Sequence, residues 1–315
     1  MEELLLSQIS EKFTTSTLQK MSAFYDNKKV SPPPGALFRA KTNNGTITAY
    51  HSGKVLFQGK SPIKEFERWA SEQKENHEQQ LSNRTHHSKY TPSHKIFTMS
   101  HIGSDESGTG DYFGPVTVCA VYVKKEYIEI LKQIGIQDSK KITDKQIPLL
   151  AKQLIEMNIP YSSMVLDNPT YNKLQKQGWT QGKMKTMLHY HVIDKLLKKI
   201  RDEYFEGIVI DQFCQPTVFK KHLATENHSL HDKTYFITKA ESYSIAVAAA
   251  SVIARLRFLQ EMERLSNLID TPLLKGASKA VDEQIGHIIQ SKGEEVLHEI
   301  AKVHFANTKK AKQLL

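Results

Sequence analysis

One segment, residues 242–265, constrains the fold of this chain more than any other. It reads SYSIAVAAASVIARLRFLQEMERL, and its first half is almost entirely apolar, so it predicts a long helix packed into a core. Strand-like runs alternate with amphipathic helical segments from residue 96 onward, at 97–106, 115–123, 144–157, 183–200 and 206–211. This alternation predicts an α/β fold in which helices lie on the faces of one sheet.

Residues 1–75 predict a separate, small α+β unit. The apolar spacing from Leu4 to Phe13 indicates a helix, and three stretches between residues 36 and 59 alternate as strands do. Asn43-Asn44-Gly45 supplies the positive φ that a tight hairpin turn requires. Pro62, after Ser61 as N-cap, starts another helix. We expect a curved three-stranded sheet with helices behind it.

Residues 76–95 interrupt this organisation. The segment is rich in His, Asn, Gln and Ser and has almost no aliphatic side chains, which is typical of a solvated linker. We therefore expect an N-terminal domain at 1–75, a polar linker at 76–95 and an α/β domain at 96–315.

Composition limits the function classes. The formal net charge of +9 favours a polyanionic partner, because lysines and arginines near phosphates release bound counterions. No apolar run is long enough to span a membrane, and the acidic N-terminus does not match a secretory signal. Cys119 and Cys214 lack the spacing of a zinc site, so we expect reduced thiols. A cytoplasmic protein is expected.

Four acidic residues stand apart from the general surface charge. Asp105 and Glu106 follow a strand-like run, Asp211 ends another, and Glu241 precedes the alanine-rich segment. Strand ends form the crevice of an α/β sheet, and carboxylates meeting there would suit hard cations such as Mg²⁺ or Mn²⁺. Two ions about 4 Å apart could then assist hydrolysis of a phosphodiester. Each acid taken singly could instead be a cap, a turn residue or a salt-bridge partner.

Two local expectations follow from this assignment. Neighbouring strand residues point to opposite faces, so Asp105 and Glu106 can share one site only if the strand ends or bulges there. Glu241 is expected to open the alanine-rich helix, where the helix dipole would favour its ionised form.

The stretch GSDESGTGDYFGPVTVCAVYV at residues 103–123 resembles the signature of type 2 ribonucleases H, in which an Asp-Glu pair precedes a Gly-x-Gly loop and a Gly-Pro. Three further stretches match that superfamily in order: GIQDSKKITD at 135–144, GIVIDQF at 207–213 and KAESYSIAVAAASVIAR at 239–255. The resemblance implies a ribonuclease H-like domain with a central mixed sheet flanked by helices.

Within the superfamily the chain resembles ribonuclease HIII. Thr109 stands between the loop glycines where HII relatives usually carry a basic residue, and the fourth acid is Glu241 where they usually carry Asp. The additional N-terminal unit also fits the HIII group, whose N-terminal domain resembles the TATA-binding-protein fold. The resemblance implies an endoribonuclease that cuts the RNA strand of RNA/DNA hybrids. HII-like excision of single ribonucleotides from DNA, or hybrid binding without catalysis, remains an alternative.

The resemblance assigns roles to particular residues. Asp105, Glu106, Asp211 and Glu241 would take the metal-binding, catalytic positions. The loop of Gly108, Thr109 and Gly110 would read the substrate, since glycines let the backbone approach a ribose and its 2′-hydroxyl. Further contacts would come from the DSKK stretch, namely Ser139, Lys140 and Lys141, although the two lysines could instead be a solvated pair at a helix start.

Other basic residues carry weaker signals. Lys183 and Lys185 are candidates for phosphate contacts, or basic residues on the exposed face of a helix. Arg39, Lys41, Lys54 and Lys60 lie on or beside the N-terminal strands, where alternation would place some of them on one exposed face. A monomer is expected.

Overall fold

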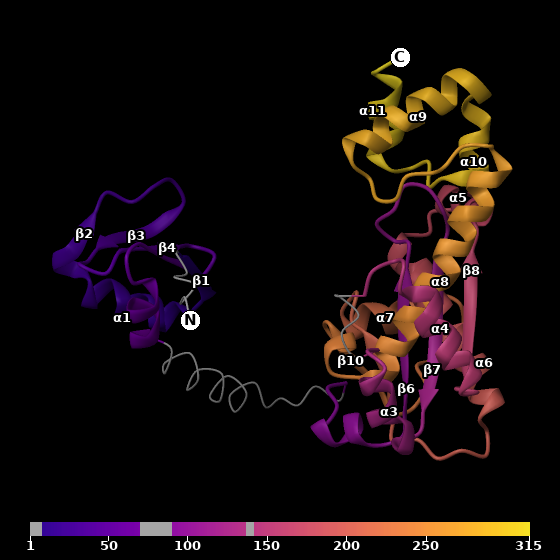
Figure 1. Ribbon diagram of the computed structural model, residues 1–315, viewed down its shortest axis with the longest axis horizontal. Helices are drawn as coiled ribbons and strands as arrows, with labels where there is room; N and C mark the ends of the chain where they lie inside the picture. The colour runs from indigo at the N-terminus through magenta and orange to yellow at the C-terminus, as the bar shows by residue number, and fades with distance from the viewer. Residues whose placement is uncertain (1–7, 70–89, 137–141) are drawn as a thin grey trace. The chain divides into compact units, whose positions relative to one another are not determined.

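The computed structural model describes residues 8–69, 90–136 and 142–315 (Figure 1). The chain divides into two compact units, Met1–Ser88 and Lys89–Leu315. The DSKK residues Ser139, Lys140 and Lys141 lie outside the described residues.

The first unit contains an antiparallel sheet with helices over one face. Its described elements are β1 (Gln8–Lys12), α1 (Thr15–Phe24), η1 (Asp26–Lys28), β2 (Lys29–Val30), β3 (Ala36–Lys41), β4 (Thr46–Tyr50), β5 (Lys54–Gln58) and a helix over residues 62–69. The strands lie in the order β1-β5-β4-β3-β2. Phe38, Ile47 and Phe57 point from the sheet into a core with Met21 of α1 and Trp69. The expected α+β unit is confirmed.

Two details of the expected N-terminal unit are wrong. Gln8–Lys12, within the expected first helix, forms strand β1 and pairs antiparallel with β5. The short alternation of residues 8–12 fits both periods, and the free edge of β5 decides in favour of the strand. With β1 and β2 added, the described sheet has five strands rather than three.

The second unit is built on a mixed sheet of the order β10-β9-β6-β7-β8. Strands β10, β9 and β6 are parallel, whereas β7 and β8 are antiparallel to their neighbours. The described strands and 3-10 helices are β6 (His101–Ser107), β7 (Val116–Val123), β8 (Tyr161–Leu166), β9 (Ile208–Asp211), β10 (Thr234–Ile237), η2 (His94–Thr98), η3 (Lys125–Tyr127), η4 (Ala240–Ser242) and η5 (Glu294–Val296).

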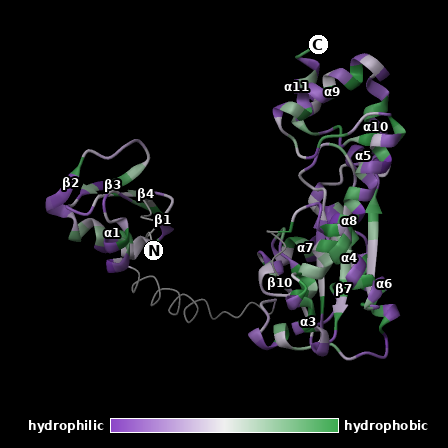
Figure 2. Cartoon of the chain, viewed as in Figure 1, coloured by the Kyte–Doolittle hydropathy of each residue, from purple (hydrophilic) through white to green (hydrophobic). Residues whose placement is uncertain are grey.

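Helices cover both faces of this sheet. They are α3 (Ile128–Gln133), α4 (Ile147–Glu156), α5 (Asn168–Lys176), α6 (Gln181–Lys199), α7 (Pro216–Ala224), α8 (Ile245–Leu268), α9 (Lys279–Lys292), α10 (Leu297–Ile300) and α11 (Ala306–Lys312). Val118 and Ala120 of β7 face α6, while Cys119 and Val121 face α8. In Figure 2 hydrophilic segments run along outer helices such as α5 and α6. The expected α/β fold with a mixed sheet is confirmed.

Helix α8 is the buried helix that residues 242–265 predict. Its alanines bring its backbone close to β6, and a Cβ added to Gly103 would lie 2.1 Å from the backbone nitrogen of Val247. The strand at this position therefore requires glycine. Helix α8 begins at Ile245 with Ser244 as its N-cap, so Glu241 lies in η4, ahead of the helix rather than at its first turn.

The end of the expected linker packs on the second unit. The carbonyl of Tyr90 accepts a hydrogen bond from the backbone N–H of Phe236, and Ile96 is buried. Both cysteines are free thiols, as expected, with Cys119 buried and Cys214 partly buried. No helix in the described part of the chain is long and apolar enough to span a membrane.

Candidate active site

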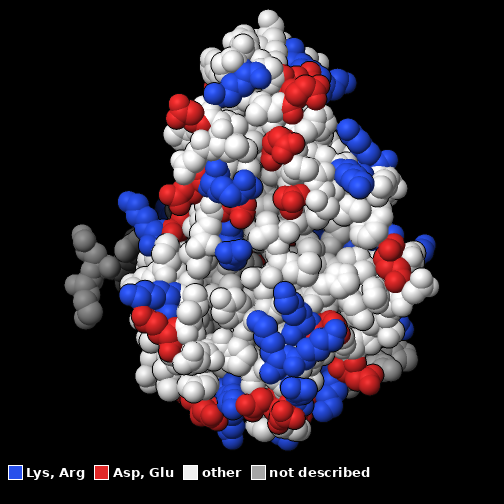
Figure 3. Space-filling view, turned by 90° about the vertical axis from the view of Figure 1, so that its right-hand side faces the viewer, with Lys and Arg blue, Asp and Glu red and all other residues white. Residues whose placement is uncertain are grey.

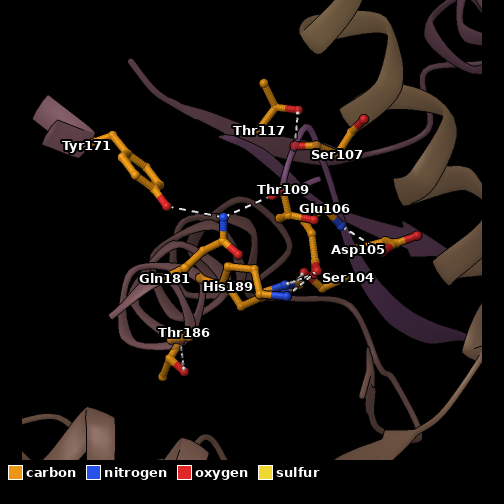
Figure 4. A network of polar contacts seen from close by, with 12 residues as sticks. Ser104, Asp105, Glu106, Ser107, Thr109, Thr117, Tyr171, Gln181, Thr186 and His189 are labelled. Atoms are coloured by element: carbon orange, nitrogen blue, oxygen red, sulfur yellow. Dashed lines mark hydrogen bonds and ion pairs between the residues drawn. The ribbon is translucent and has the colours of Figure 1, made fainter. Parts of the chain in front are cut away.

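Asp105 and Glu106 lie side by side on β6, but they point to opposite faces of the sheet. Strand β6 neither ends nor bulges between them, because Asp105 pairs with Cys119 and Glu106 with Val118 in regular register. Asp105 therefore faces α8 and Glu106 faces α6, as Figure 4 shows. The strand therefore has neither the end nor the bulge that a shared site on one face would require.

Asp211 lies on the strand next to Asp105. It is the last residue of β9, which runs parallel to β6 with Gly103 opposite Val209 and Ser104 opposite Ile210. Alternation places Asp211 on the same face as Val209, the face toward α8. Its Oδ1 accepts the N–H of Ala240, 2.8 Å away, at the start of η4, which carries Glu241. The parallel strands thus bring three of the four acids close together.

The carboxylates raise one another's pKa values. Burial, together with the charges of Glu106 and Asp211, raises the pKa of Asp105 well above its ordinary value. Burial also raises the pKa of Asp211, and the charges of Glu241 and Glu106 act in the same direction. Like charges held close together in a poorly solvated place favour a bound cation.

Glu106 is held by two cationic or hydrogen-bonding partners on α6. Lys185 Nζ donates to Oε1 at 2.7 Å, and His189 Nε2 lies 2.8 Å from Oε2. Burial alone would raise the pKa of Glu106, but His189 and Lys185 outweigh it and leave the pKa below its ordinary value. The other His189 ring nitrogen lies 2.7 Å from the Ser104 hydroxyl, which donates to the carbonyl of Cys119. Glu106 is therefore fixed as an ionised carboxylate.

Three residues of α6 form one polar stripe toward β6 and the loop that follows it. Gln181, Lys185 and His189 are spaced by four positions, so they lie on one helix face. Gln181 Nε2 donates to the carbonyl of Thr109 at 3.0 Å. The sequence interpretation that places Lys185 on an exposed face is wrong, because its side chain is only 12% exposed. The roles of Gln181 and His189 were missed, although the i, i+4, i+8 spacing is a signal for them.

A second ionic group lies on the α8 side. Arg255 binds both carboxylate oxygens of Asp144, at 2.8 and 2.9 Å, and also donates to Ser107 Oγ. Lys275 Nζ binds the same carboxylate, and Arg255 and Lys275 lower the pKa of Asp144 to about 2. A pocket of about 250 Å³ lies here, lined in part by Ser107, Ser251 and Arg255. The ion pairs hold residue 144 beside the end of β6.

The two loop glycines differ in whether the fold itself requires glycine at that position. Gly108 is buried with φ +88°, and an added Cβ would lie 2.2 Å from the carbonyl oxygen of Pro115 and 2.7 Å from the Phe258 ring. Gly110 is exposed, and an added Cβ would meet nothing within 4 Å. The protein itself therefore requires glycine at Gly108, whereas Gly110 leaves open space for a ligand.

The donor set suits a hard divalent cation, because all four acids offer oxygen ligands and repel one another. Among the residues that the structure describes, no three His, Cys, Asp or Glu side chains form a ready metal-binding group. Glu106 is turned to α6, which accounts for its separation from the other acids. These residues would complete a site only by reorienting around the ion.

Lys185→Met is expected to lower the free energy of unfolding by about 1–3 kcal/mol, because it leaves the Glu106 carboxylate buried with His189 as its main partner. Adding Glu106→Gln to this variant should recover most of the loss, since the unpaired charge is then gone. Urea denaturation of the two single variants and the double variant measures the coupling. Lys198→Met, at an exposed ion pair of the same helix, should leave the free energy of unfolding nearly unchanged. Additive effects of the two substitutions would contradict the pairing.

The sheet order, the helix layers and the acids near the ends of β6 and β9 define the second unit as ribonuclease H-like. The family model described as Ribonuclease HII matches residues 102–308, and a domain of unknown function, DUF3378, matches residues 8–82. The solved structure of Bst-RNase HIII in complex with Mn²⁺ is 39% identical, with a TM-score of 0.68, and the match covers 98% of this chain and 99% of that one.

Curated relatives agree along almost the whole length. Ribonuclease HIII of Oceanobacillus iheyensis is 53% identical over 302 residues, covering 96% of this chain and 97% of the relative. Ribonuclease HIII of Bacillus subtilis is 45% identical over 304 residues, covering 96% of each. The chain belongs to the ribonuclease HIII family.

Proposed function

We propose that the protein is an endoribonuclease that hydrolyses the RNA strand of RNA/DNA hybrids with the help of divalent metal ions. The observation that carries the proposal is the placement of three carboxylates together: Asp105 on β6, Asp211 at the end of the parallel neighbouring strand β9, and Glu241 in η4, which hydrogen-bonds Asp211 through Ala240. A protein that only bound phosphates would gain nothing from a negative pocket there. Family membership and the Mn²⁺ complex of Bst-RNase HIII support the same reading.

Asp105, Glu106, Asp211 and Glu241 would hold two divalent metal ions, Mg²⁺ or Mn²⁺. When bound, the metal would supply Lewis-acid stabilisation of the charge that develops on the phosphate. Lys185 and His189 orient the Glu106 carboxylate from α6, and the Ala240 N–H orients that of Asp211. The exposed Gly110 gives a ribose room to approach the backbone beside these carboxylates.

A strand-labelled cleavage assay tests the proposal. We expect the protein to cut the RNA of a continuous RNA/DNA hybrid in the presence of Mg²⁺ or Mn²⁺, to leave duplex DNA intact and to lose activity in EDTA. Preferred cleavage of a duplex with one embedded ribonucleotide would favour the HII-like alternative. Binding of the hybrid without any product in either metal would contradict catalysis.

We further propose that the first unit supplies affinity for the substrate. Arg39, Lys41 and Lys54 alternate with buried residues of β3 and β5, so they share the sheet face opposite the helices. Arg39 Nε is buried without a hydrogen-bond partner among the described residues. A face that combines such cations with half-buried Tyr50 and Leu56 suits a phosphate backbone. Lys60 follows β5 and is exposed.

Changing Arg39, Lys41 and Lys54 together to Gln is expected to weaken hybrid binding and to lower the slope of log K against log salt by about 2–3, because up to three phosphate contacts are lost. The maximal rate should change by less than about threefold, since these residues belong to the first unit and the four candidate acids to the second. Titrations at several salt concentrations, with steady-state kinetics, measure both effects.

The matched control for this variant changes Lys20, Lys64 and Arg68 to Gln on the helices of the same unit. It removes the same charge from the other face and should leave the salt slope nearly unchanged. Removal of residues 1–75 should likewise raise KM more than it lowers kcat. An unchanged slope in the sheet variant would exclude this face from binding. Cytoplasmic location and a monomeric state stay predictions.

A further inference from the structure

The loop that joins β6 to β7 is held by hydrogen-bond donors from other parts of the second unit. Its carbonyl groups at Thr109, Asp111, Tyr112 and Gly114 each accept a hydrogen bond from outside the loop. We propose that Gln181 and Lys302 are positioning residues for ribose recognition, because they fix these carbonyls and thereby turn the Gly110 N–H outward to a 2′-hydroxyl. This inference rests on the proposed function and assigns residues to its substrate specificity.

Lys302 holds the C-terminal part of the loop, from Asp111 to Gly114. Its side chain is fully buried, and its ammonium group donates to the carbonyls of Asp111, at 2.8 Å, and Gly114. Its backbone N–H donates to the carbonyl of Tyr112 at 2.9 Å. Burial lowers the pKa of Lys302 to about 7, and no carboxylate is recorded as its hydrogen-bond or ion-pair partner among the described residues. A lysine buried without a carboxylate partner is costly, which indicates a specific role for it.

Gln181 holds the N-terminal part of the loop, at Thr109. Its Nε2 donates to the Thr109 carbonyl at 3.0 Å and to the hydroxyl of buried Tyr171 at 3.2 Å (Figure 4). Gln181 is the first residue of α6, and the bond of the Thr180 hydroxyl with the N–H of Lys183 caps this helix end. The amide is thus presented from a rigid element and directed by a second hydrogen bond.

The peptide plane transmits this contact to Gly110. Thr109 O and Gly110 N belong to one planar trans peptide unit, in which the C=O and N–H point in opposite directions. Because Gln181 binds the carbonyl, the N–H of Gly110 points away from Gln181. Gly110 is exposed, and its N–H has no acceptor among the described residues. An outward N–H without an acceptor, beside the carboxylates of β6, can donate to a ribose oxygen that DNA lacks.

A cycle between protein and substrate tests the proposal. Wild type and Gln181→Met are compared on a chimeric strand with four ribonucleotides, paired with DNA, in which each ribose in turn carries 2′-fluorine in place of the 2′-hydroxyl. We expect wild type to lose about 10-fold or more in kcat/KM at one position, as for a lost hydrogen bond in a desolvated site. Gln181→Met should lose about 10-fold on the all-ribose strand but less than about threefold further on fluorination.

Binding and folding are measured alongside. In an Asp105→Asn background, Gln181→Met should bind the uncut hybrid within about threefold of the parent, which separates positioning from affinity. Gln177→Met, the same change at an exposed glutamine before α6, should behave as wild type. Lys302→Met should show the same reduced sensitivity to fluorine. If that variant unfolds below the assay temperature, the Gln181 cycle decides alone.

The outcomes are distinct. If Gln181→Met slows the all-ribose and fluorinated strands by equal factors, Gln181 does not act on ribose recognition and the proposal is overturned. If wild type shows no sensitivity to fluorine at any position, the 2′-hydroxyl is not read by the loop, which also overturns it. If wild type cuts no hybrid at all, the proposed function fails instead.

Discussion

Replacing Asp105 by asparagine is expected to reduce cleavage of an RNA/DNA hybrid by on the order of 10³-fold or more, because a ligand carboxylate at the reacting phosphate is lost. Binding of the hybrid should be unchanged or tighter, since one negative charge near the phosphates is removed. Single-turnover cleavage and equilibrium binding measure the two effects separately.

The same substitution should stabilise the metal-free protein. Burial and the charges of Glu106 and Asp211 raise the pKa of Asp105 in the folded state, so its ionised form destabilises the fold. The wild type therefore loses stability as pH rises from the ordinary aspartate pKa through the folded pKa. Asp105→Asn lacks this loss, so the difference should be small near pH 4 and reach about 1 kcal/mol or more at neutral pH. Thermal unfolding in EDTA at both pH values measures it.

Asp202→Asn, at an almost fully exposed carboxylate, is the control and should alter neither activity nor stability. Cleavage by Asp105→Asn at more than a tenth of the wild-type rate would remove Asp105 from the catalytic group. A variant that is destabilised at neutral pH would show that Asp105 is stabilised by its neighbours rather than repelled by them.

Figure 3, which shows one face of the molecule, has basic side chains gathered in one patch with acidic ones at its edge.

The two loop glycines should separate stability from activity. Gly108→Ala is expected to cost about 3 kcal/mol of unfolding free energy, because it combines φ +88° with contacts at 2.2 Å to Pro115 and 2.7 Å to Phe258. Gly110→Ala should change stability by less than about 0.5 kcal/mol, since its Cβ meets open space. Its kcat/KM on the hybrid should nevertheless fall about 10-fold or more, because a methyl group stands where the ribose would approach.

Urea denaturation and steady-state kinetics of both variants measure these effects. Gly286→Ala, inside α9, where an added Cβ makes only ordinary contacts, is the control and should stabilise the protein by about 0.5–1 kcal/mol. A fully active Gly110→Ala protein would mean that the substrate does not approach this residue. A stable Gly108→Ala protein would mean that Phe258 and the loop can move apart at little cost.

Local patterns predicted much of this protein. Apolar and amphipathic periods along the chain predicted the sheet, α4, α6 and the buried helix α8, because burial of one face imposes a period of two or 3.6 residues. The first helix was predicted wrongly, since Gln8–Lys12 is too short for its period to decide, and pairing with β5 determines its conformation. The acids were identifiable because they follow apolar strand-like runs, where a carboxylate needs a compensating partner.

By itself, the sequence determined the fold class, the four candidate acids and the glycine loop, because each of these can be recognised from the residues that flank it in the chain. Only the tertiary structure decided which groups meet. It directs Asp105 and Glu106 to opposite faces and turns Lys185 and His189 inward to Glu106. It also brings Lys302 to the loop after β6, where it binds the carbonyl of Gly114, 188 positions earlier in the chain. Such contacts depend on strand register and on which helix face packs inward, and neither is fixed by residues adjacent in the chain.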